Sequence, residues 1–366
     1  MTRTGVAAIV DQLDGVFRID EVEFDDPRGR EVLVEVHAAG LCHSDLNVAS
    51  VDRGRSLPLI AGHELAGVVR AVGDAVSNLR VGDHVVGTEV RACGSCSACN
   101  IGRPTLCTFP DSLERLPTEP PRVRRGSDRI NTLGVSAFAT YSLADERQFV
   151  RIPAELPFDV ASLLGCGVTT GVGAVLNVAR VAPAERVAVF GLGGVGLNIV
   201  AGAALAGARQ IVAVDVDQRK LELARQFGAT QVVQSAGTAT HEAVRAVCPH
   251  GVDHAFDAVG IPDVTTEAIR STASGGTTYL IGIPKPGQVL EVDTMADMIG
   301  AQRGIRGIYM GGTNPARDIP LFAELALSGR LPIAQLISER ITIGDINRAY
   351  ASPAASGARA VLTTLR

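Results

Sequence analysis

The sequence has no excess of basic residues. Its 34 lysines and arginines are outnumbered by 39 aspartates and glutamates, which gives a formal net charge of −5. A chain with this balance has no broad positive field to attract nucleic acid or an anionic membrane. We therefore expect a small-molecule partner, with no nucleic acid and no membrane.

Signals for membrane insertion and export are also lacking. One uncharged stretch, residues 187–208, is long enough to span a bilayer, but it contains six glycines. Glycines at this density predict a strand, a turn and a closely packed helix instead. The N-terminus lacks the apolar run of a signal peptide. These features predict a cytoplasmic location.

The cysteines do not form the even set of a disulfide framework. There are seven, and four of them lie within fifteen residues in the pattern C-x2-C-x2-C-x7-C: Cys93, Cys96, Cys99 and Cys107. In a reducing compartment, four thiolates at this spacing favour a closed tetrahedral zinc site. Such a site would be structural because no ligand position is left for water. An iron–sulfur cluster is the alternative.

Length and hydrophobic patterning predict an α/β protein of two domains. Residues 1–167 contain short apolar runs cut by turns, which indicate largely antiparallel β-structure, with the cysteine lobe at 91–108. Residues 168–303 alternate strands with helix-length segments, which is typical of a doubly wound parallel sheet. Residues 304–366 return to turns and strands and are expected to rejoin the first domain. The Pro- and Arg-rich segment 108–132 is expected to be a solvated loop or extension.

A glycine-rich motif with an acidic residue behind it predicts a dinucleotide site. The motif follows a strand and opens a helix, so that backbone N–H groups can meet a pyrophosphate, and it comprises Gly191, Gly193, Gly194, Val195 and Gly196. Asp215 ends the next strand, 19 residues after Gly196, where its carboxylate can bind the adenosine ribose and repel the 2′-phosphate of NADP. This pair predicts NAD; a turn used only for packing, with a helix-capping aspartate, is the alternative. Lys220 either binds the same ribose or is an ordinary solvated lysine.

A second set of metal-ligand residue types is dispersed along the chain. Cys42 lies in the segment Gly-Leu-Cys-His-Ser-Asp at 40–45, His63 and Glu64 follow a glycine, and Cys166 lies between two glycines. Spacing alone does not show that these residues converge. Taken singly, a cysteine is more often a small buried apolar residue, and a histidine such as His63 a satisfied core residue.

Together these motifs resemble the medium-chain zinc-dependent alcohol dehydrogenases. The resemblance rests on residues 62–67 (Gly-His-Glu-Leu-Ala-Gly), the cysteine lobe, residues 164–171 and residues 189–196, in that order, and it covers nearly the whole chain. It implies a GroES-like β-rich catalytic domain and a Rossmann NAD-binding domain. It also implies two zinc ions per chain, one structural ion on the cysteine lobe and one catalytic ion. The ligands of the catalytic ion would be Cys42, His63 and Cys166, with Glu64 as an alternate ligand or electrostatic neighbour.

The resemblance assigns further roles around the catalytic zinc. Zinc would lower the pKa of a bound alcohol, hydride would pass to the nicotinamide, and Ser44 would take the alcohol proton. Asp45 would orient His63 through a hydrogen bond. Asn47 stands where many liver-type members carry a relay histidine. Because asparagine does not titrate, the proton must leave by water or by another route.

Contacts to cofactor and substrate follow from the same resemblance. Four residues would touch the cofactor, two at the nicotinamide and two at the pyrophosphate: Thr170 and Val195, and His43 and Arg359, respectively. Phe138 would be an apolar wall of the substrate pocket. Glu89 replaces an aromatic residue of that pocket and would favour a cationic or hydroxyl-rich substrate, unless it lies on a solvated turn.

The activity implied is that of an NAD-dependent alcohol dehydrogenase, which interconverts a primary, aromatic or polar alcohol with an aldehyde or ketone. One alternative is a thiol-dependent formaldehyde dehydrogenase acting on a mycothiol or glutathione adduct, because residues 201–207 and 331–340 resemble that branch. A nucleotide-binding regulator without turnover is a remote alternative. The segment 108–132 resembles the longer loop of dimeric branches and predicts a homodimer.

Overall fold

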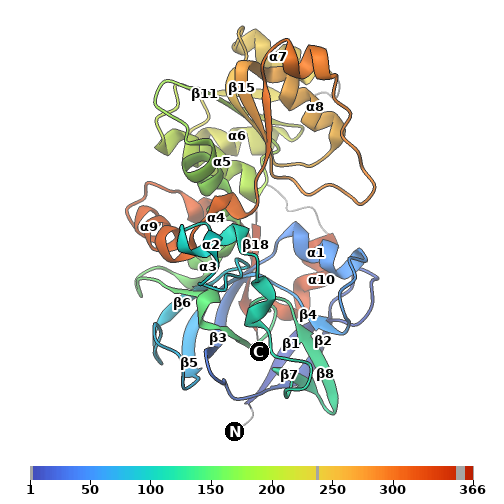
Figure 1. The fold of residues 1–366 in the computed structure, drawn as a ribbon, viewed down its shortest axis with the longest axis vertical. Helices are drawn as coiled ribbons and strands as arrows, with labels where there is room; N and C mark the ends of the chain where they lie inside the picture. The colour runs from blue at the N-terminus through green and yellow to red at the C-terminus, as the bar shows by residue number, and fades with distance from the viewer. Residues whose placement is uncertain (1–2, 236–238, 352–358, 366) are drawn as a thin grey trace. The chain divides into compact units, whose positions relative to one another are not determined.

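The computed structural model describes residues 3–235, 239–351 and 359–365. The chain folds into two compact units (Figure 1). The first unit comprises Met1–Cys166, Asn314–Gly329 and Ile333–Arg366, and the second comprises Gly167–Thr313 with Arg330–Pro332. In the sequence, the main segment of the second unit therefore lies between Cys166 and Asn314 of the first.

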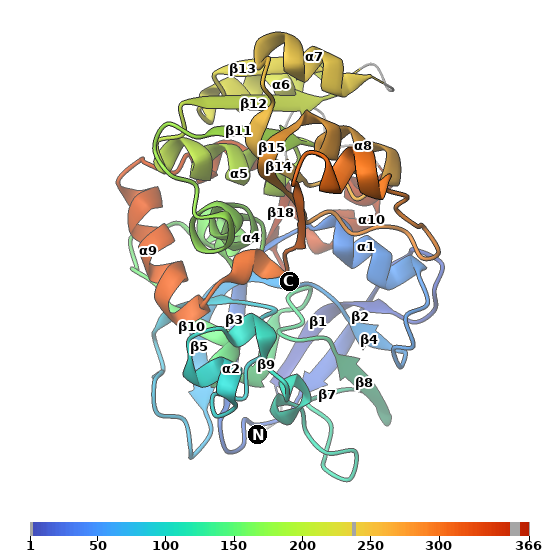
Figure 2. The ribbon, with the colours of Figure 1, turned by 45° about the horizontal axis from the view of Figure 1, so that its top comes forward.

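The first unit is built on two β-sheets, most of whose strands are labelled in Figure 2. A closed barrel has the strand order β1-β2-β7-β8-β4, and the other sheet has the order β10-β6-β5-β3-β18-β17, with β9 beside β3. The barrel strands are β1 (Arg3–Val10), β2 (Arg18–Phe24), β4 (Leu59–Ile60), β7 (Val123–Arg125) and β8 (Asp128–Thr132). The other strands are β3 (Glu31–Gly40), β5 (Glu64–Val72), β6 (His84–Gly87), β9 (Tyr141–Asp145), β10 (Phe149–Arg151), β17 (Ile337–Thr342) and β18 (Arg359–Thr364). The helices of this unit are α1 (His43–Ser50), α2 (Ser97–Asn100), α3 (Phe158–Ser162), α9 (Pro315–Leu327) and α10 (Ile346–Ala351).

Strand β3 contributes to two hydrophobic cores. Val32, Val34 and Val36 belong to one cluster of buried side chains, and Leu33 belongs to the other. Successive side chains of a strand point to opposite faces, so β3 is buried on both sides. Near the end of β3, Gly40 pairs with Val361 of the C-terminal strand β18. The last strand of the chain thus adjoins the segment that leads into Cys42.

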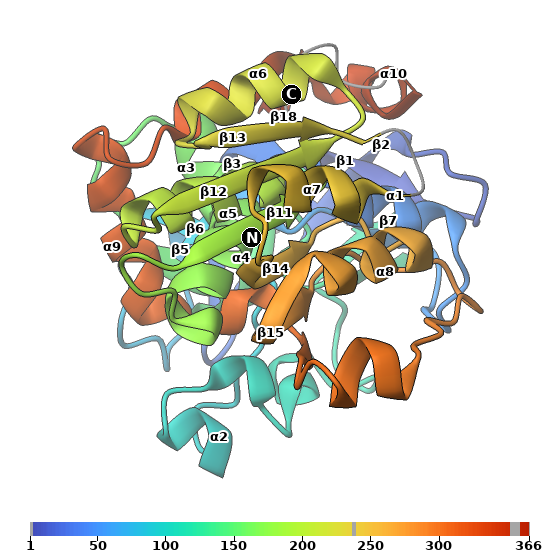
Figure 3. The ribbon, with the colours of Figure 1, turned by 90° about the horizontal axis from the view of Figure 1, so that it is seen from above.

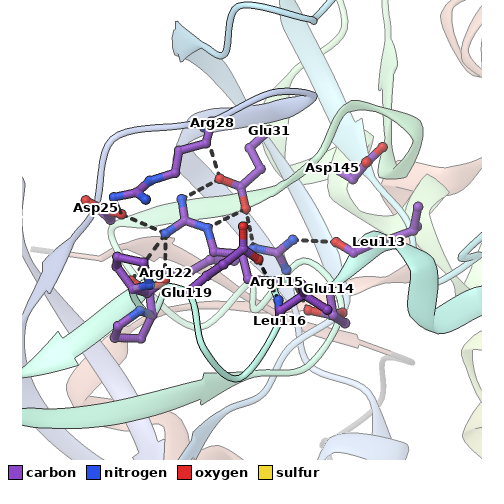
Figure 4. A network of polar contacts seen from close by, with 12 residues as sticks. Asp25, Arg28, Glu31, Leu113, Glu114, Arg115, Leu116, Glu119, Arg122 and Asp145 are labelled. Carbon is purple, nitrogen blue, oxygen red and sulfur yellow. Dashed lines mark hydrogen bonds and ion pairs between the residues drawn. The ribbon is translucent and has the colours of Figure 1, made fainter.

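Residues 108–132 are only in part the solvated loop or extension that the sequence predicts: residues 116–119 and 126–129 are exposed, but other positions are buried. They contain the β7–β8 hairpin, and two of their arginines are buried against one glutamate (Figure 4). Arg122 Nε donates to Glu31 Oε1 at 2.8 Å, and Arg115 donates to both carboxylate oxygens of Glu31. Arg115 also pairs with Asp25 at 2.7 Å. Paired carboxylates let arginine be buried, a compensation that local composition does not reveal. We call Glu31, Arg115 and Arg122 the arginine clamp.

The second unit confirms the predicted doubly wound parallel sheet. Its strand order is β13-β12-β11-β14-β15-β16, and all five pairings are parallel (Figure 3). Numbered along the unit this is 3-2-1-4-5-6, the Rossmann order. The strands are β11 (Arg186–Phe190), β12 (Gln210–Asp215), β13 (Gln231–Gln234), β14 (Val252–Asp257), β15 (Thr272–Leu280) and β16 (Gly304–Gly307). The helices are α4 (Gly167–Gly173), α5 (Gly194–Leu205), α6 (Gln218–Gln226), α7 (Thr240–Val247) and α8 (Pro262–Ser271).

The chain returns to the first unit later than the sequence predicts. The predicted C-terminal segment begins at residue 304, but β16 pairs with β15 as the sixth strand of the parallel sheet. The first unit resumes at Asn314. β16 is only four residues long, and half of it is exposed. Its sequence therefore has no hydrophobic periodicity that would assign it to a parallel sheet.

The uncharged stretch 187–208 is a strand, a turn and a helix, as predicted. It runs through β11 and α5, and a Cβ at Gly202 would lie 3.2 Å from the Cα of Val172, so the helix packs closely against α4. Among the described residues, no single helix is long and apolar enough to cross a membrane. One consecutive pair, Phe158–Gly165 and Gly167–Ala179, passes that test only when its two bent parts are joined.

Candidate active site and metal centres

The four cysteines of the lobe form one compact group beside α2. The sulfur atoms are separated by 3.5 Å for Cys96–Cys99, 3.9 Å for Cys96–Cys107 and 4.0 Å for Cys93–Cys99. Four sulfurs around zinc, at bonds of about 2.3 Å, form a tetrahedron with edges of about 3.8 Å. All four sulfurs lie within 4.8 Å of one another, which suits one ion and leaves no room for the iron and sulfide atoms of a cluster. None of the cysteines forms a disulfide.

Backbone N–H groups point at these sulfur atoms. The N–H of Cys93 donates to Cys107 Sγ at 3.2 Å, and the N–H of Cys96 donates to Cys93 Sγ at 3.3 Å. Backbone hydrogen bonds at Cys99 and Thr108 lower the pKa of the Cys96 thiol to about 5. Donors of this kind favour the thiolate form that metal binding requires. The lobe therefore fits a closed zinc site.

The dispersed residues also converge, which spacing alone could not show. Cys42 caps the N-terminus of α1, Glu64 begins β5 with His63 directly before it, and Cys166 follows the short helix Leu163–Gly165. The ligand atoms of these four residues lie within 4.8 Å of one another. Gly40 and Glu64 are partners across β3 and β5, so both segments reach the group from one end of the sheet. We call Cys42, His63, Glu64 and Cys166 the mixed-ligand group.

Asp45 joins the two segments that carry Cys42 and His63. Its buried carboxylate accepts hydrogen bonds from the N–H of Gly62 at 3.0 Å and of Cys42 at 3.3 Å, and it lies 3.0 Å from His63 Nδ1. A donor bond from Nδ1 leaves Nε2 as the ligand atom. Ser44 Oγ lies 3.4 Å from that Nε2. The structure thus places Asp45, the predicted partner of His63, and Ser44, the predicted acceptor of the alcohol proton, next to the His63 ring.

Glu64 is fully buried inside the mixed-ligand group. Within the described residues neither of its carboxylate oxygens accepts a hydrogen bond, and Arg359 Nη2 lies 3.3 Å from Oε1. Burial raises the pKa of Glu64 to about 7, against the opposing effect of the Arg359 guanidinium. A buried carboxylate with unfilled acceptor positions beside two thiols and an imidazole is a donor set that fits zinc.

Arg359 lies against this group rather than at the surface. It is 9% exposed, and its guanidinium donates to the carbonyl of Leu41 at 3.4 Å and to Cys42 Sγ at 3.7 Å. The pyrophosphate contact expected of Arg359 stays a prediction, as does that of His43, which is exposed on α1. Asn47 is half-buried on the same helix.

The glycine motif has the shape that the dinucleotide prediction requires. Gly191 has a φ of +86°, and a Cβ at Gly196 would overlap the Gly191 carbonyl, so neither position admits a side chain. Around Gly193, the N-cap of α5, an added Cβ would meet no atom within 4 Å. This leaves an open cradle in front of the N–H groups of the first helical turn, where an anion can bind.

Asp215 and Lys220 meet beside this motif. Asp215 ends β12, and its Oδ2 accepts the N–H of Leu192 at 2.7 Å and lies 3.9 Å from Lys220 Nζ. Lys220 is therefore directed toward the predicted ribose contact. Sequence reasoning did not single out Val216, which is 70% exposed directly after Asp215 and offers an apolar surface to a base. The sequence signal for Val216 is an apolar residue directly after the end of the strand.

The predicted contacts at the nicotinamide and in the substrate pocket involve Thr170, Val195 and Glu89. Thr170 is buried on α4, where its hydroxyl donates to Met310 Sδ at 3.7 Å, and a Cβ at Gly171 would lie 2.6 Å from the carbonyl oxygen of Val195. These two helices of the second unit are therefore packed closely, and the nicotinamide contacts of Thr170 and Val195 stay predictions. Glu89 is half-buried beyond β6.

Phe138 lies in a hydrophobic core, with its ring against Gly62, the residue before His63. Its ring is fully buried in a hydrophobic core, where it packs edge to face against Phe17 with centroids 5.8 Å apart. The predicted role of Phe138 in the substrate pocket stays a prediction. An apolar residue looks the same in sequence at either place.

A pocket of about 810 Å³ in the first unit is separate from the mixed-ligand group. Residues beside the cysteine lobe line it, among them Ala92, Gly94, Pro104 and Arg147. Neither Cys42, His63 nor Cys166 lines this pocket. It is therefore not the predicted substrate site.

Comparison with known proteins agrees with the fold and with zinc binding. Residues 28–154 match the alcohol dehydrogenase GroES-like domain, and residues 194–327 match the zinc-binding dehydrogenase family. The chain is 33% identical over 352 residues to an S-(hydroxymethyl)glutathione dehydrogenase of Synechocystis sp., covering 94% of this chain and 95% of that protein. A solved alcohol dehydrogenase zinc-binding domain protein from Burkholderia ambifaria superposes with a TM-score of 0.93 at 35% identity and full coverage of both chains. Benzyl alcohol dehydrogenase from Acinetobacter calcoaceticus gives 0.92 at 30% identity, with 99% of each chain covered.

A Rossmann sheet, a β-rich unit and two metal-ligand groups define a metal-dependent dehydrogenase. The chain belongs to the zinc-dependent medium-chain alcohol dehydrogenases. It is an oxidoreductase that acts on the CH–OH group of a small alcohol, or on the corresponding aldehyde, and zinc and NAD are its cofactors.

Proposed function

We propose that the mixed-ligand group is the catalytic zinc site and that the cysteine lobe is the structural one. The observation that carries this proposal is the convergence of Cys42, His63 and Cys166 within 4.8 Å in one buried group. Three protein ligands leave a position for substrate, whereas four thiolates close a site. Zinc bound at the mixed-ligand group supplies Lewis acidity that lowers the pKa of an alcohol, and bound NAD accepts hydride.

The chain's own residues would bind and move the proton. Ser44, beside His63, accepts the proton of the alcohol, and Asp45 holds His63 in the orientation that presents Nε2. Asn47 does not titrate, so the proton leaves by water or by another route. Among the remaining residues, Glu89 lines the substrate site, Thr170 and Val195 contact the nicotinamide, and His43 and Arg359 contact the pyrophosphate.

Metal content and turnover test the proposal together. We expect about two zinc atoms per chain by mass spectrometry, with NADH formed from primary, benzylic or amino alcohols. Removal of the less tightly held zinc by dipicolinate should abolish turnover, and added zinc should restore it. One zinc per chain with no turnover would leave the cysteine lobe standing but overturn the catalytic assignment.

NAD preference is proposed to depend on the carboxylate of Asp215. Asp215→Asn is expected to raise the KM for NAD about tenfold and to narrow the preference for NAD over NADP, because a charge-assisted bond is lost and repulsion of a 2′-phosphate is relieved. The measurement is kcat/KM with each cofactor. Asp217→Asn, which removes the neighbouring carboxylate at the N-cap of α6, is the matched control. An unchanged cofactor ratio in Asp215→Asn would contradict the ribose assignment.

A second candidate is oxidation of a thiol adduct of formaldehyde. It is favoured by relatives named S-(hydroxymethyl)glutathione dehydrogenase, whereas the likeness to benzyl alcohol dehydrogenase favours a free alcohol. The two are separated by NADH formation from formaldehyde with and without glutathione or mycothiol. Strict dependence on a thiol, with no turnover of benzyl alcohol, would replace the first proposal by the second.

A cytoplasmic homodimer is proposed as the working form. β16 is the outermost strand of its sheet, and an edge strand can pair with the same strand of a second copy across a two-fold axis. Exposed apolar residues flank this edge in the sequence: Val289, Met295, Ile299 and Tyr309. Light scattering should give the mass of two chains, and Ile299→Lys should lower it toward one.

A further inference from the structure

Tyr350, on the C-terminal helix α10, contacts the backbone of a residue in the mixed-ligand group. Its hydroxyl donates to the carbonyl of Cys42 at 3.1 Å. The same carbonyl accepts the N–H of Asp45, also at 3.1 Å. Cys42 is the N-cap of α1, so this carbonyl lies at the turn that aims the Cys42 thiol. Sequence reasoning missed Tyr350 because an isolated tyrosine in a short helix matches no motif.

The position of the Tyr350 ring is fixed by other contacts. The ring stacks on Phe17 with centroids 5.4 Å apart and planes 20° apart, and Phe17 in turn packs against Phe138 in the core. Asn347, one turn earlier on α10, accepts the N–H of Phe17 at 2.9 Å and donates to its carbonyl at 2.8 Å. The hydroxyl is thus held at Cys42 by a rigid support.

The preceding residue is held in the same way from the C-terminal strand. The carbonyl of Leu41 accepts from Arg359, and the N–H of Leu41 donates to the carbonyl of Ala360 at 2.9 Å. Both carbonyls of the Leu41–Cys42 dipeptide therefore receive a side-chain donor from the last part of the chain. Two separate donors on adjacent peptide units restrict rotation of the backbone that carries the ligand.

We propose that Tyr350 is a positioning residue of the catalytic metal site, whose hydroxyl holds the Cys42 backbone so that its thiolate meets the metal together with His63 and Cys166. This inference rests on the proposed assignment of the mixed-ligand group to catalytic zinc. Tyr350 acts through Cys42 and touches neither substrate nor cofactor in this role. Loss of a residue that contacts a metal ligand, but not the metal itself, typically lowers the metal affinity about 10–100-fold.

Tyr350→Phe tests the hydroxyl while keeping the ring that stacks on Phe17. The expected result is about tenfold faster loss of the catalytic zinc to dipicolinate and a shifted thiolate-to-metal band when cobalt(II) replaces that zinc. Loss of zinc from the cysteine lobe should keep its wild-type rate and serves as an internal reference. Tyr141→Phe is the matched control, since Tyr141 packs against Phe24 in the other core of the same unit.

Two outcomes separate this inference from the assignment beneath it. If the wild-type enzyme binds two zinc atoms and Tyr350→Phe changes neither the release rate nor the cobalt spectrum, the positioning role is wrong and the catalytic site stands. If the wild-type enzyme binds only one zinc, the assignment itself fails. Asn347→Ala removes the two hydrogen bonds to the backbone of Phe17, on which the Tyr350 ring stacks. This variant should also lose the catalytic zinc faster than the wild type, by a smaller factor than Tyr350→Phe. Unchanged zinc release in this variant would also count against the positioning role.

Discussion

Replacement of Cys166 by serine is expected to remove one of two zinc ions per chain and to lower kcat/KM by more than about 100-fold. The loss should exceed the roughly 10–100-fold effect of removing a partner one step from a metal, because a thiolate ligand itself is lost. Cys166 lies in the buried mixed-ligand group. The hydroxyl of a serine at this position would be a neutral and weaker ligand for zinc than the thiolate. Metal analysis and steady-state kinetics with NAD and benzyl alcohol measure both effects.

The matched control is Cys248→Ser. Cys248 is equally a buried free cysteine, but it lies in the second unit and donates from its sulfur to the carbonyl of Gly251 at 3.1 Å. A serine hydroxyl can make the same bond, so two zinc atoms and near wild-type kcat/KM are expected. Retention of both zinc ions and of activity by Cys166→Ser would contradict the catalytic assignment.

Glu31→Gln is expected to lower the free energy of unfolding of the first unit by about 3–5 kcal/mol, because it leaves the two buried guanidinium groups of the arginine clamp without their shared charge. The side chains of Arg115 and Arg122 are only 7% and 4% exposed. Denaturant unfolding monitored in the first unit measures the change. Glu23→Gln, at an exposed position of β2, should cost less than about 0.5 kcal/mol. Equal stability of the two variants would contradict a buried clamp.

The same clamp predicts the direction of acid sensitivity. Burial acts to raise the pKa of Glu31, but the hydrogen bonds and charges of Arg115 and Arg122 hold it below its ordinary value of 4.5. A carboxylate with a depressed pKa in the folded state stabilises the protein above its unfolded pKa. That contribution is lost as the pH falls through the folded value. Wild-type stability should therefore fall in acid more steeply than that of Glu31→Gln.

Features carried by adjacent residues were predictable from the sequence. The cysteine lobe lies within fifteen residues, and Asp215 follows the glycine motif at the distance of one helix and one strand, so local spacing determines both. The mixed-ligand group required a family resemblance because its residues are far apart in the sequence. The pairing of β3 with β5 brings the segment of Cys42 beside Glu64, and Gly165, the residue before Cys166, lies against the backbone of His63.

Features that depend on distant packing were not predictable. The burial of Arg115 and Arg122 depends on Glu31, more than eighty residues away, and the composition of 108–132 indicated solvent. The sequence context of Phe138 does not show that its ring is fully buried in the core. Tyr350 contacts a residue 308 positions earlier, and only the three-dimensional fold reveals that contact.

The pairing of β18 with β3 also sets an order of events during synthesis on the ribosome. The second unit is almost continuous in the chain and can fold once residues up to 313 have emerged. The sheet of the first unit remains without an inner strand until β18 leaves the exit tunnel. Arg359 lies in β18, and Tyr350 lies before it in the chain, so both reach Cys42 only after the residues up to β18 have been synthesised. A nascent chain would therefore have a folded nucleotide domain before it has a finished catalytic centre.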